Sequence, residues 1–497
     1  MIHLKKTAEF KPKGGTAIYV LGEESNKPGA KTALPQEAFS GMLALKLEPG
    51  KVESLKTVKE AALTTELYAL LPKEADYDAL EEITSELVKN LRALKAGPVA
   101  VVLGDEALGQ LTGAFYKQLW LSDDGFDRYQ TSGISPIDPQ KERKDKEAFA
   151  PAYTIYLPEG FSLKAEEETC RLARQYADGI RTARALVNEP ANVLTPERLA
   201  QEASALARQH GFEIEVYDEK QIQKMGLEAF WSVAKGSDAP PRFLVMRYMN
   251  RPDHKETLAL VGKGLTYDSG GYALKPAAGM DTMFCDMGGA AAVIGAISTL
   301  AAMKAKVNVV GIVAACENMI SGHAYHNGDI IGSLAGKFIE VVNTDAEGRI
   351  TLADAITYAV TVIKADKIID IATLTGAVGI ALGREITGVV ADDEGIFRAI
   401  QEASDKSGDK VWRLPHFDHL AKHNKSERAD IKNSGGRPAG TATAALFCRA
   451  FSFGVPWGHL DIAGTAYQEK ASAKAPMGAT GVGAELLARA AIKLFER

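Results

Sequence analysis

The sequence predicts an α/β protein of two domains: a smaller N-terminal α/β domain and a larger C-terminal domain whose mainly parallel sheet is flanked by helices. The chain has 497 residues, which is long for one hydrophobic core. Its composition, 46% hydrophobic and 25% charged residues, is typical of globular proteins. In the second half of the chain, apolar runs of strand length alternate with helical patterns, as in parallel sheets covered on both faces.

Residues 1–165 are expected to form the smaller domain. Three short apolar runs predict strands and two segments have helical spacing: Thr16–Leu21, Pro98–Leu103, Tyr153–Leu157, Ala79–Leu94 and Leu108–Leu121. A charged run at Lys141–Glu147 follows a stretch that contains proline and glycine, which predicts an exposed loop or hairpin. This part of the sequence has no nucleotide-binding loop.

A bridging helix is expected over residues 166–190, with the larger domain at 191–497. Glu166–Val187 carries apolar residues on one helical stripe. Thr195 and Pro196 have the residue types of an N-cap and a first helical position, so a second helix should begin there.

Beyond that point the expected strands and helices alternate, with no internal repeat. Seven segments predict strands: Phe212–Tyr217, Phe243–Tyr248, Thr257–Gly262, Val307–Ala314, Phe338–Val342, Lys367–Ala372 and His459–Ile462. Helical spacing is clearest at Ala290–Met303 and Leu352–Ile363.

Charge and cysteine usage narrow the functional classes. The 58 basic and 64 acidic residues leave a formal charge of −6, which gives no electrostatic reason to expect a nucleic-acid surface. Four widely spaced cysteines form no CxxC pair, so buried free thiols are expected. The N-terminus lacks an apolar signal core, and no run is expected to reach membrane-spanning length, so the sequence predicts a cytoplasmic protein.

An acidic motif, Asn343–Arg349, contains Asp345 and Glu347 and follows the strand-like run Lys337–Val342. If strand geometry persists through the motif, the two carboxylates point the same way and suit a divalent cation. The alternative is a capped helix, since Asp and Glu favour the positive N-terminus of a helix.

A second polar cluster lies some sixty residues earlier, with Lys263, Asp268, Lys275 and Asp286. Together with the acidic motif, the three aspartates and Glu347 would supply four negative charges. Four carboxylates in one pocket repel or take up protons unless cations neutralise them, and two divalent metals would balance this set. Oxygen-rich ligation fits Mg, Mn or Zn, and histidines are absent from both stretches.

At these residues the chain resembles the leucyl (cytosol) aminopeptidase family, a group of dinuclear-metal exopeptidases. The resemblance covers most of residues 180–497 and is carried by five ordered segments: Val261–Val293, Asn343–Arg349, Asp370–Ala377, Ile431–Gly436 and Trp457–Gly464. It implies a catalytic metallopeptidase domain at 191–497, an N-terminal oligomerisation or accessory domain, and a leucyl aminopeptidase-type hydrolase.

By this resemblance, Asp268 and Glu347 are expected to bridge two metal ions. Lys263 and Asp286 would complete the tighter site, and Asp345 the looser one. Lysine coordinates only as the neutral amine, and two adjacent dications would supply the required lowering of its pKa. Taken alone, Lys263 between glycines is more typical of an exposed lysine at a strand end.

The resemblance also assigns catalytic roles to Lys275 and Arg349. Lys275 would stabilise the oxyanion formed when a water activated by the two metals attacks the peptide carbonyl. Arg349 would hold a bicarbonate ion that carries the proton. The alternative for Arg349 is an ion pair with a local carboxylate.

The substrate's free amino terminus would bind one metal near Asp286, which makes the enzyme an exopeptidase. The positions that match the family's substrate-lining residues are small, apolar or hydroxylated: Met283, Thr373, Leu374, Gly376, Ala463 and Ala466. They indicate a leucine-like or other apolar N-terminal residue, although such residues are also ordinary core fillers. Ala466 departs from the larger residue of some members, so narrow specificity for dipeptides such as cysteinylglycine is an open alternative.

The family resemblance further implies Mn or Zn as the metal, peptides as substrates, and a homohexamer. Some members also bind DNA, a role that the acidic charge of this chain disfavours. His416, His419 and His423 have helical spacing but lie in a polar stretch and are expected at a surface; His459 is expected to be a hydrogen-bonded core residue.

Overall fold

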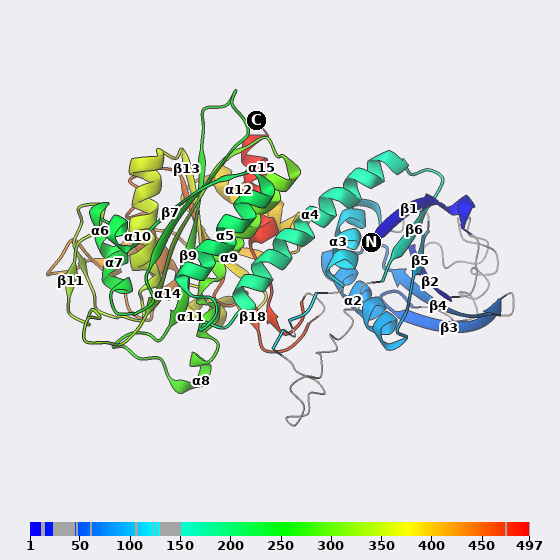
Figure 1. The fold of residues 1–497 in the computed structure, drawn as a ribbon, viewed down its shortest axis with the longest axis horizontal. Helices are drawn as coiled ribbons and strands as arrows, with labels where there is room; N and C mark the ends of the chain where they lie inside the picture. The colour runs from blue at the N-terminus through cyan, green and yellow to red at the C-terminus, as the bar shows by residue number, and fades with distance from the viewer. Residues whose placement is uncertain are drawn as a thin grey trace, which may run out of the picture. The chain divides into compact units, whose positions relative to one another are not determined.

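The computed structural model describes residues 1–10, 15–22, 45, 48–59, 62–104, 108–122, 124–126, 128–129, 151–472 and 475–496. The chain forms two compact units, Met1–Ala177 with Ala471–Pro476 and Asp178–Lys470 with Met477–Arg497 (Figure 1). The division falls within the long helix α4, Leu163–Asn188. The predicted loop at Lys141–Glu147 lies outside the described residues.

The first unit contains a six-stranded sheet in the order β1-β6-β5-β2-β4-β3, parallel except for the β3–β4 pair. Its strands are β1 Ile2–Lys6, β2 Gly15–Gly22, β3 Val52–Lys59, β4 Ala62–Leu71, β5 Val99–Leu103 and β6 Tyr153–Leu157. The helices α2 (Tyr77–Ala93) and α3 (Thr112–Leu121) pack on one face, where residues such as Leu87 and Phe115 are fully buried against Ile155. The predicted segments of this domain are confirmed, whereas β1, β3 and β4 were not predicted.

The second unit contains an eight-stranded sheet in the order β15-β14-β17-β13-β9-β10-β8-β7. Its strands are β7 Glu213–Tyr217, β8 Arg242–Met249, β9 Leu258–Asp268, β10 Asn308–Asn318, β13 Lys367–Ala372, β14 Thr387–Ala391, β15 Val411–Arg413 and β17 Trp457–Asp461. The four central strands β17, β13, β9 and β10 run parallel, so their carboxyl ends meet at one edge of the sheet. The mixed architecture confirms the predicted α/β class with a mainly parallel central sheet.

Helices cover both faces of this sheet. On one face lie α5 (Pro196–His210), α9 (Gly288–Met303), α12 (Glu394–Ser407) and α15 (Ala484–Phe495); on the other lie α7 (Glu228–Ala234), α10 (Gly348–Tyr358) and α14 (Gly440–Arg449). Side chains alternate along β9 accordingly: an added Cβ on Gly262 would meet the backbone of α9, whereas Lys263 lies against Gly348 at the start of α10.

The start of α5 confirms the predicted cap. The Thr195 hydroxyl oxygen accepts the N–H of Arg198 at 3.3 Å, and Pro196 occupies the first helical position, where its missing N–H costs no hydrogen bond. The helix ends at Gly211, whose φ of 79° places it in the left-handed region.

One predicted strand of the main sheet is wrong. Of the run Phe338–Val342, Ile339–Glu340 alone forms a strand, β12, and it belongs to a separate three-stranded sheet with β11 (Ile330–Ile331) and β16 (Ile431–Lys432). Phe338 and Val342 are exposed, so the apolar run is not a buried sheet strand. The helix that follows begins at Gly348 rather than Leu352, and its last turn, Ala359–Ile363, is a π-helix.

The expectation that no segment reaches membrane-spanning length was also wrong. The segment Ala277–Met303, which runs from the short helix α8 (Ala277–Met280) through a turn and a 3-10 helix into α9, qualifies by length and composition, but 89% of the qualifying window is buried inside the protein. The segment ends in α9, which packs on the central strands, so its apolarity matches that of a core helix. The four cysteines, Cys170, Cys285, Cys316 and Cys448, are free and buried, as predicted.

Candidate active site

The candidate site lies at the carboxyl ends of the four parallel strands. Asn318 ends β10, Asp268 ends β9, Thr373 directly follows β13, and Asp461 ends β17. In open α/β sheets this edge is where ligands bind, because side chains from several rigid strands converge there.

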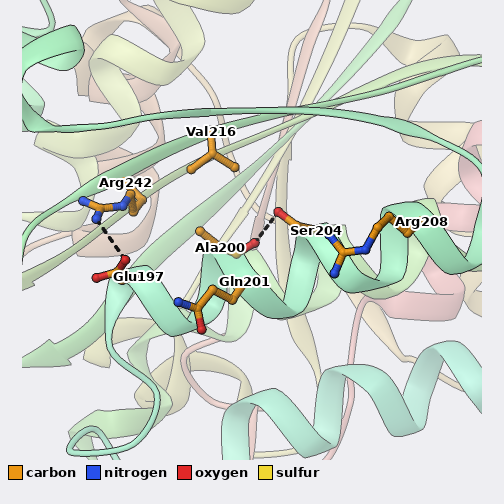
Figure 2. A pocket seen from close by; sticks show the side chains of 7 residues that line it. All are labelled: Glu197, Ala200, Gln201, Ser204, Arg208, Val216 and Arg242. Atoms are coloured by element: carbon orange, nitrogen blue, oxygen red, sulfur yellow. Dashed lines mark hydrogen bonds and ion pairs between the residues drawn. The ribbon is translucent and has the colours of Figure 1, made fainter.

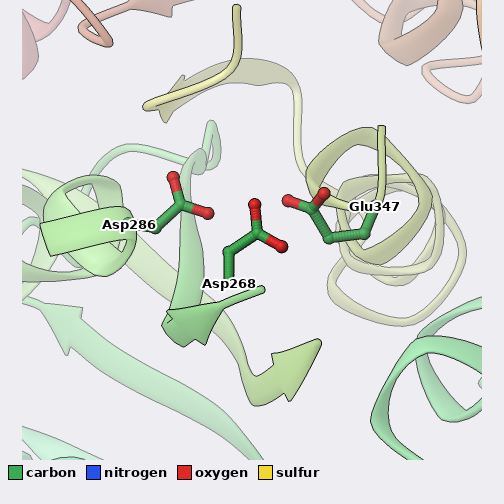
Figure 3. Close-up of side chains that lie close together, drawn as sticks. All are labelled: Asp268, Asp286 and Glu347. Carbon is green, nitrogen blue, oxygen red and sulfur yellow. The ribbon is translucent and has the colours of Figure 1, made fainter. Parts of the chain in front are cut away.

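Three carboxylates from separate segments point toward one another at this edge (Figure 3). Asp268, Asp286 in the 3-10 helix η4 (Met283–Met287), and Glu347 before α10 each offer an oxygen within 4.8 Å of the others. Their exposed fractions are 1%, 5% and 1%. Carboxylates this close and this buried repel one another unless cations lie between them.

Two lysines lie between the carboxylates. The Nζ atom of Lys263 is 2.7 Å from Asp286 Oδ2 and 2.9 Å from Glu347 Oε1. The Nζ atom of Lys275 is 2.7 Å from Asp268 Oδ2 and 2.6 Å from Asp345 Oδ1. Lys275 therefore joins Asp345 to Asp268, and each of the five metal-ligand candidates predicted from sequence takes part in an ion pair.

Burial changes the protonation of this cluster. It raises the pKa of Glu347 to about 8, with the Asp268 carboxylate adding to the shift, and it raises the pKa of Asp286 to about 6 against the opposing charge of Lys263. The pKa of Asp345 is also raised by burial. For Lys263, burial lowers the pKa, but Asp286, Glu347 and Asp268 together outweigh it and raise the pKa above its usual range.

Among the described residues, three buried oxygens of the cluster accept no hydrogen bond: Asp286 Oδ2 and Asp345 Oδ1, which face lysines in the ion pairs above, and Glu347 Oε2. Glu347 Oε2 is buried and accepts no hydrogen bond, although Oε1 of the same carboxylate meets Lys263. A buried carboxylate oxygen without a partner costs free energy, and a divalent cation would satisfy it. Four carboxylates against two lysines leave two formal negative charges, so the donor set fits metal ions.

The orientation of the acidic motif differs from the sequence prediction. Residues 341–347 are not a strand, and Glu347 has helical dihedral angles (φ −72°, ψ −37°). Asp345 and Glu347 converge because the chain turns between them, not because they alternate along a strand. A glycine completes the turn: a Cβ on Gly348 would lie 2.5 Å from Lys263 Cε, so a side chain here would displace the Lys263 amine from its ion pairs.

Arg349 lies in the first turn of α10 and is 8% exposed. Its Nη1 group donates to the backbone carbonyl of Asn433 at 2.8 Å, and its Nε group is buried without a partner. Within the described part of the chain it has no carboxylate partner, so the local ion pair considered from sequence does not form. Burial lowers the pKa of Arg349 from its usual value.

The sequence prediction missed two buried asparagines that fix the acidic segments. Asn318 Nδ2 donates to Asp268 Oδ1 at 2.8 Å and to the Thr344 carbonyl at 3.0 Å. The Asn433 side chain donates to the Asn343 carbonyl at 2.6 Å and accepts the N–H of Val342 at 2.9 Å. Both are 0% exposed, and both orient carboxylate-bearing backbone from positions distant in sequence.

Five of the six predicted substrate-lining residues lie in the segments that follow β13 and β17, and the sixth, Met283, begins η4. The Thr373 hydroxyl donates to Asp286 Oδ1 at 2.7 Å, and its backbone carbonyl accepts from Lys263 Nζ at 2.9 Å. An added Cβ on Gly288 would lie 3.3 Å from Ala466 and 3.5 Å from Thr373, which brings Ala466 to the same region. The remaining predicted positions are half-buried or exposed: Met283, Leu374, Gly376 and Ala463.

The histidines take no part in this cluster. His416 is half-buried and His419 and His423 are exposed, as predicted for a surface. His459 is fully buried in β17, with Nδ1 2.5 Å from Asp370 Oδ1, which confirms a hydrogen-bonded core residue.

A separate groove of about 280 Å³ lies in the same unit, among α5, β7 and β8 (Figure 2). It is lined by Glu197, Ala200, Gln201, Ser204, Arg208, Val216 and Arg242. Glu197 pairs with Arg242 at 3.4 Å across it, and no metal-ligand candidate lines it, so the groove is not the acidic site.

Comparison with known proteins matches the sequence to one family. Residues 181–488 match the model of the cytosol aminopeptidase family, catalytic domain. A probable cytosol aminopeptidase of Clostridium perfringens is 56% identical over 306 residues, which are 61% of this chain and 62% of the relative. One from Treponema denticola is 40% identical over 92% of this chain and 93% of its own length, and one from Synechococcus sp. is 41% identical over 96% and 93%.

The family match spans more than half of the chain and contains every metal-ligand candidate in the acidic cluster. The chain therefore belongs to the cytosol aminopeptidase family and is a metal-dependent aminopeptidase, a hydrolase that releases residues from the N-termini of peptides.

Proposed function

We propose that this aminopeptidase holds two divalent cations between Lys263, Asp268, Asp286, Asp345 and Glu347. The observation that carries the proposal is the convergence of three buried carboxylates around an unpartnered oxygen, Glu347 Oε2. Mn and Zn are the proposed metals, because carboxylate and amine donors without histidine suit both.

The lysines explain how the site stays formed before a metal binds. Lys263 and Lys275 hold the carboxylates in place as ion pairs, so the acidic residues do not separate. The Lys263 ammonium coordinates nothing until it loses its proton, so metal binding is expected to release protons and to weaken at low pH.

The metals, when bound, would polarise the scissile carbonyl and lower the pKa of a water molecule near it. Side chains of the protein would stabilise the oxyanion and hold the proton carrier. Lys275, whose side chain is 20% exposed, would stabilise negative charge on the carbonyl oxygen. Arg349 stays cationic and cannot serve as a base, so we propose that its free Nε group helps to hold a bicarbonate ion as proton carrier.

Substrate selection is proposed to rest on Met283, Thr373, Leu374, Gly376, Ala463 and Ala466. The amino terminus of the peptide would lie near Asp286, whose Oδ1 is already oriented by Thr373. Apolar contacts from Met283, Leu374 and the two alanines would favour a leucine-like first residue.

Peptides with free N-termini are the proposed partners, and we propose a homohexamer in the cytoplasm. The relatives carry the word cytosol in their names. The net charge of −6 makes a nucleic-acid partner unlikely on electrostatic grounds. Light scattering at working concentration tests the hexamer, and a monomer mass would contradict it.

The proposal is tested with chelator-stripped protein, leucine p-nitroanilide, and Mn or Zn added stepwise. Activity should return with metal and saturate near two ions per chain. The matched control substrate is N-acetyl-leucine p-nitroanilide, which lacks the free amine and should not be cleaved. Failure of every divalent metal to restore activity, or equal cleavage of the acetylated substrate, would contradict the proposal.

A further inference from the structure

Asp461 is a fully buried carboxylate on which two separate loops converge. It ends β17 and pairs in register with Ala372, the last residue of β13. The segments that follow these two strands, 373–376 and 463–466, contain most of the proposed substrate-lining residues. Asp461 therefore lies where both of these segments, called the two loops below, leave the sheet.

Four hydrogen bonds tie the loops to this one side chain. Asp461 Oδ1 accepts the backbone N–H groups of Leu374 at 3.2 Å, Thr375 at 3.4 Å and Ala463 at 3.2 Å. Asp461 Oδ2 accepts the Thr375 hydroxyl at 2.6 Å. The hydroxyl bond is short and the three backbone bonds are long, but all four act in the buried interior, where an unpaired N–H group costs more than it does in water.

The Thr375 hydroxyl extends the network to the next helix. It accepts the N–H of Val378 at 3.2 Å, which caps α11 (Gly376–Leu382), and it lies 2.9 Å from the Thr441 hydroxyl. Because Thr375 gives its single hydroxyl proton to Asp461, Thr441 donates to Thr375. The Asp461 carboxylate therefore fixes the direction of the hydrogen bonds that Thr375 makes to Thr441 and α11.

We infer that Asp461 is a positioning residue that sets the shape of the substrate pocket by holding both lining loops, although it touches no substrate itself. The inference rests on the proposed assignment of these loops to the pocket. It predicts a larger effect on the choice of N-terminal side chain than on metal binding. None of the four bonds reaches a metal-ligand candidate directly, although Thr373, next to Leu374, contacts Lys263 and Asp286.

The test compares Asp461→Asn and Asp461→Ala with Asp354→Asn as matched control. Asp354 is equally buried and accepts two backbone N–H groups, from Phe230 at 2.9 Å and Leu334 at 2.8 Å, but neither belongs to the two loops. The first readout is the ratio of kcat/KM for leucine over alanine p-nitroanilide. Metal content per chain is measured alongside it.

Asp461→Ala should lower the leucine-to-alanine ratio about tenfold, the range expected when an apolar pocket stops recognising a few methylene groups. Its metal content should stay close to that of the wild type. Asp461→Asn keeps one oxygen for the three N–H groups but loses the acceptor for Thr375, so it should lower the ratio roughly threefold. Asp354→Asn should leave the ratio within about twofold of the wild type.

The second readout, amide hydrogen exchange, needs no activity. Peptides that cover 373–376 and 463–466 should exchange faster in both Asp461 variants and unchanged in Asp354→Asn. If Asp461→Ala does not fold, the two asparagine variants decide the question. An unchanged ratio, or unchanged exchange in both loops of Asp461→Asn, would overturn the inference. A wild type without aminopeptidase activity would overturn the proposed function instead, and exchange would still decide whether Asp461 holds the loops.

Discussion

Glu347 and Asp354 lie seven residues apart, one just before α10 and one within it, and they show two ways of burying an acid. Both are at most 1% exposed, and burial raises the pKa of both, to about 8 for Glu347 and about 7 for Asp354. Glu347 has a lysine on one oxygen and nothing on the other. Asp354 has backbone N–H groups on both oxygens.

The difference separates a binding group from a structural one. The two backbone N–H groups cannot move away from Asp354 unless the segments that carry them unfold. Asp354 therefore has a structural role, in which it holds α7 and residue 334. A lysine side chain can rotate or lose its proton, so the partner of Glu347 is exchangeable. An acid with an exchangeable partner and an empty acceptor is suited to a metal ion, whereas an acid with fixed, complete partners is not.

The largest expected effect comes from removing the charge on the acidic motif. The double variant Asp345→Asn, Glu347→Gln should lower kcat/KM for leucine p-nitroanilide by at least about 10³-fold, because metal binding and the catalytic charge fail together. Metal content per chain, measured by mass spectrometry, should fall as well. Asp354→Asn is the matched control and should keep its metal. Full activity in the double variant would contradict the assignment of Glu347 as a metal-binding acid and Asp354 as a structural one.

Replacing Lys275 should give the next largest effect. Lys275→Met should lower kcat by about 10²–10³-fold through the loss of positive charge at the carbonyl oxygen, with metal content retained. Steady-state kinetics with metal analysis separates the two roles. If Lys275→Met instead loses its metal and keeps kcat in the remaining loaded fraction, Lys275 holds the site together and does not act on the substrate.

A smaller effect is expected at Asn433, which holds the acidic motif through its backbone. Asn433→Ala should weaken metal binding about 10- to 100-fold, the usual range for a residue that orients metal ligands. Competition with a fluorescent chelator measures this affinity. Asn424→Ala provides a comparison, because Asn424 is also a buried asparagine but donates to the Thr443 carbonyl in α14. Equal losses in both variants would indicate general destabilisation.

The smallest effect on activity, and a distinct effect on stability, is expected at Asp354. Burial, with Glu228 adding to it, raises the pKa of Asp354 from 3.8 to about 7 in the folded state. The unfolded chain therefore loses this proton first as pH rises, so stability falls between pH 4 and 7, by roughly 4 kcal/mol at most, and levels off above pH 7.

Asp354→Asn lacks this titration, so its free energy of unfolding relative to the wild type should rise from pH 5 to pH 8. Urea unfolding at both values measures the difference, while the leucine-to-alanine ratio stays constant. A difference that does not change with pH would show that the backbone amides keep Asp354 ionised in the fold, which would increase the contrast between Asp354 and Glu347.

What the sequence could predict depended on the distance between interacting groups. Thr195 and Pro196 were predicted correctly, because a helix cap involves residues three positions apart. The run Phe338–Val342 was misassigned, because its apolar residues do not reveal that two of them are exposed. The geometry of Asp345 and Glu347 depended on a turn that no strand or helix pattern encodes.

Asn318 and Asn433 could not have been predicted from one sequence, because each acts on a segment 26 to 91 residues away. Asparagine is common in loops, and nothing local distinguishes these two from a turn residue. Asp461 lies in Trp457–Gly464, a segment that carries the family resemblance, but its role depends on the pairing of β13 with β17 and so is not visible in the sequence. Residues that orient ligands are therefore harder to find from sequence than the ligands themselves.

The crowding at Gly348 has a consequence for how the protein tolerates mutation. Any side chain at this position would meet the Lys263 stem within 3 Å and push its amine out of line with Asp286 and Glu347. In a library that samples every amino acid at every position, residue 348 should be as intolerant as a metal ligand, although it contributes no donor atom. Selection on the active site is therefore expected to act on residue 348 as strictly as on the metal ligands.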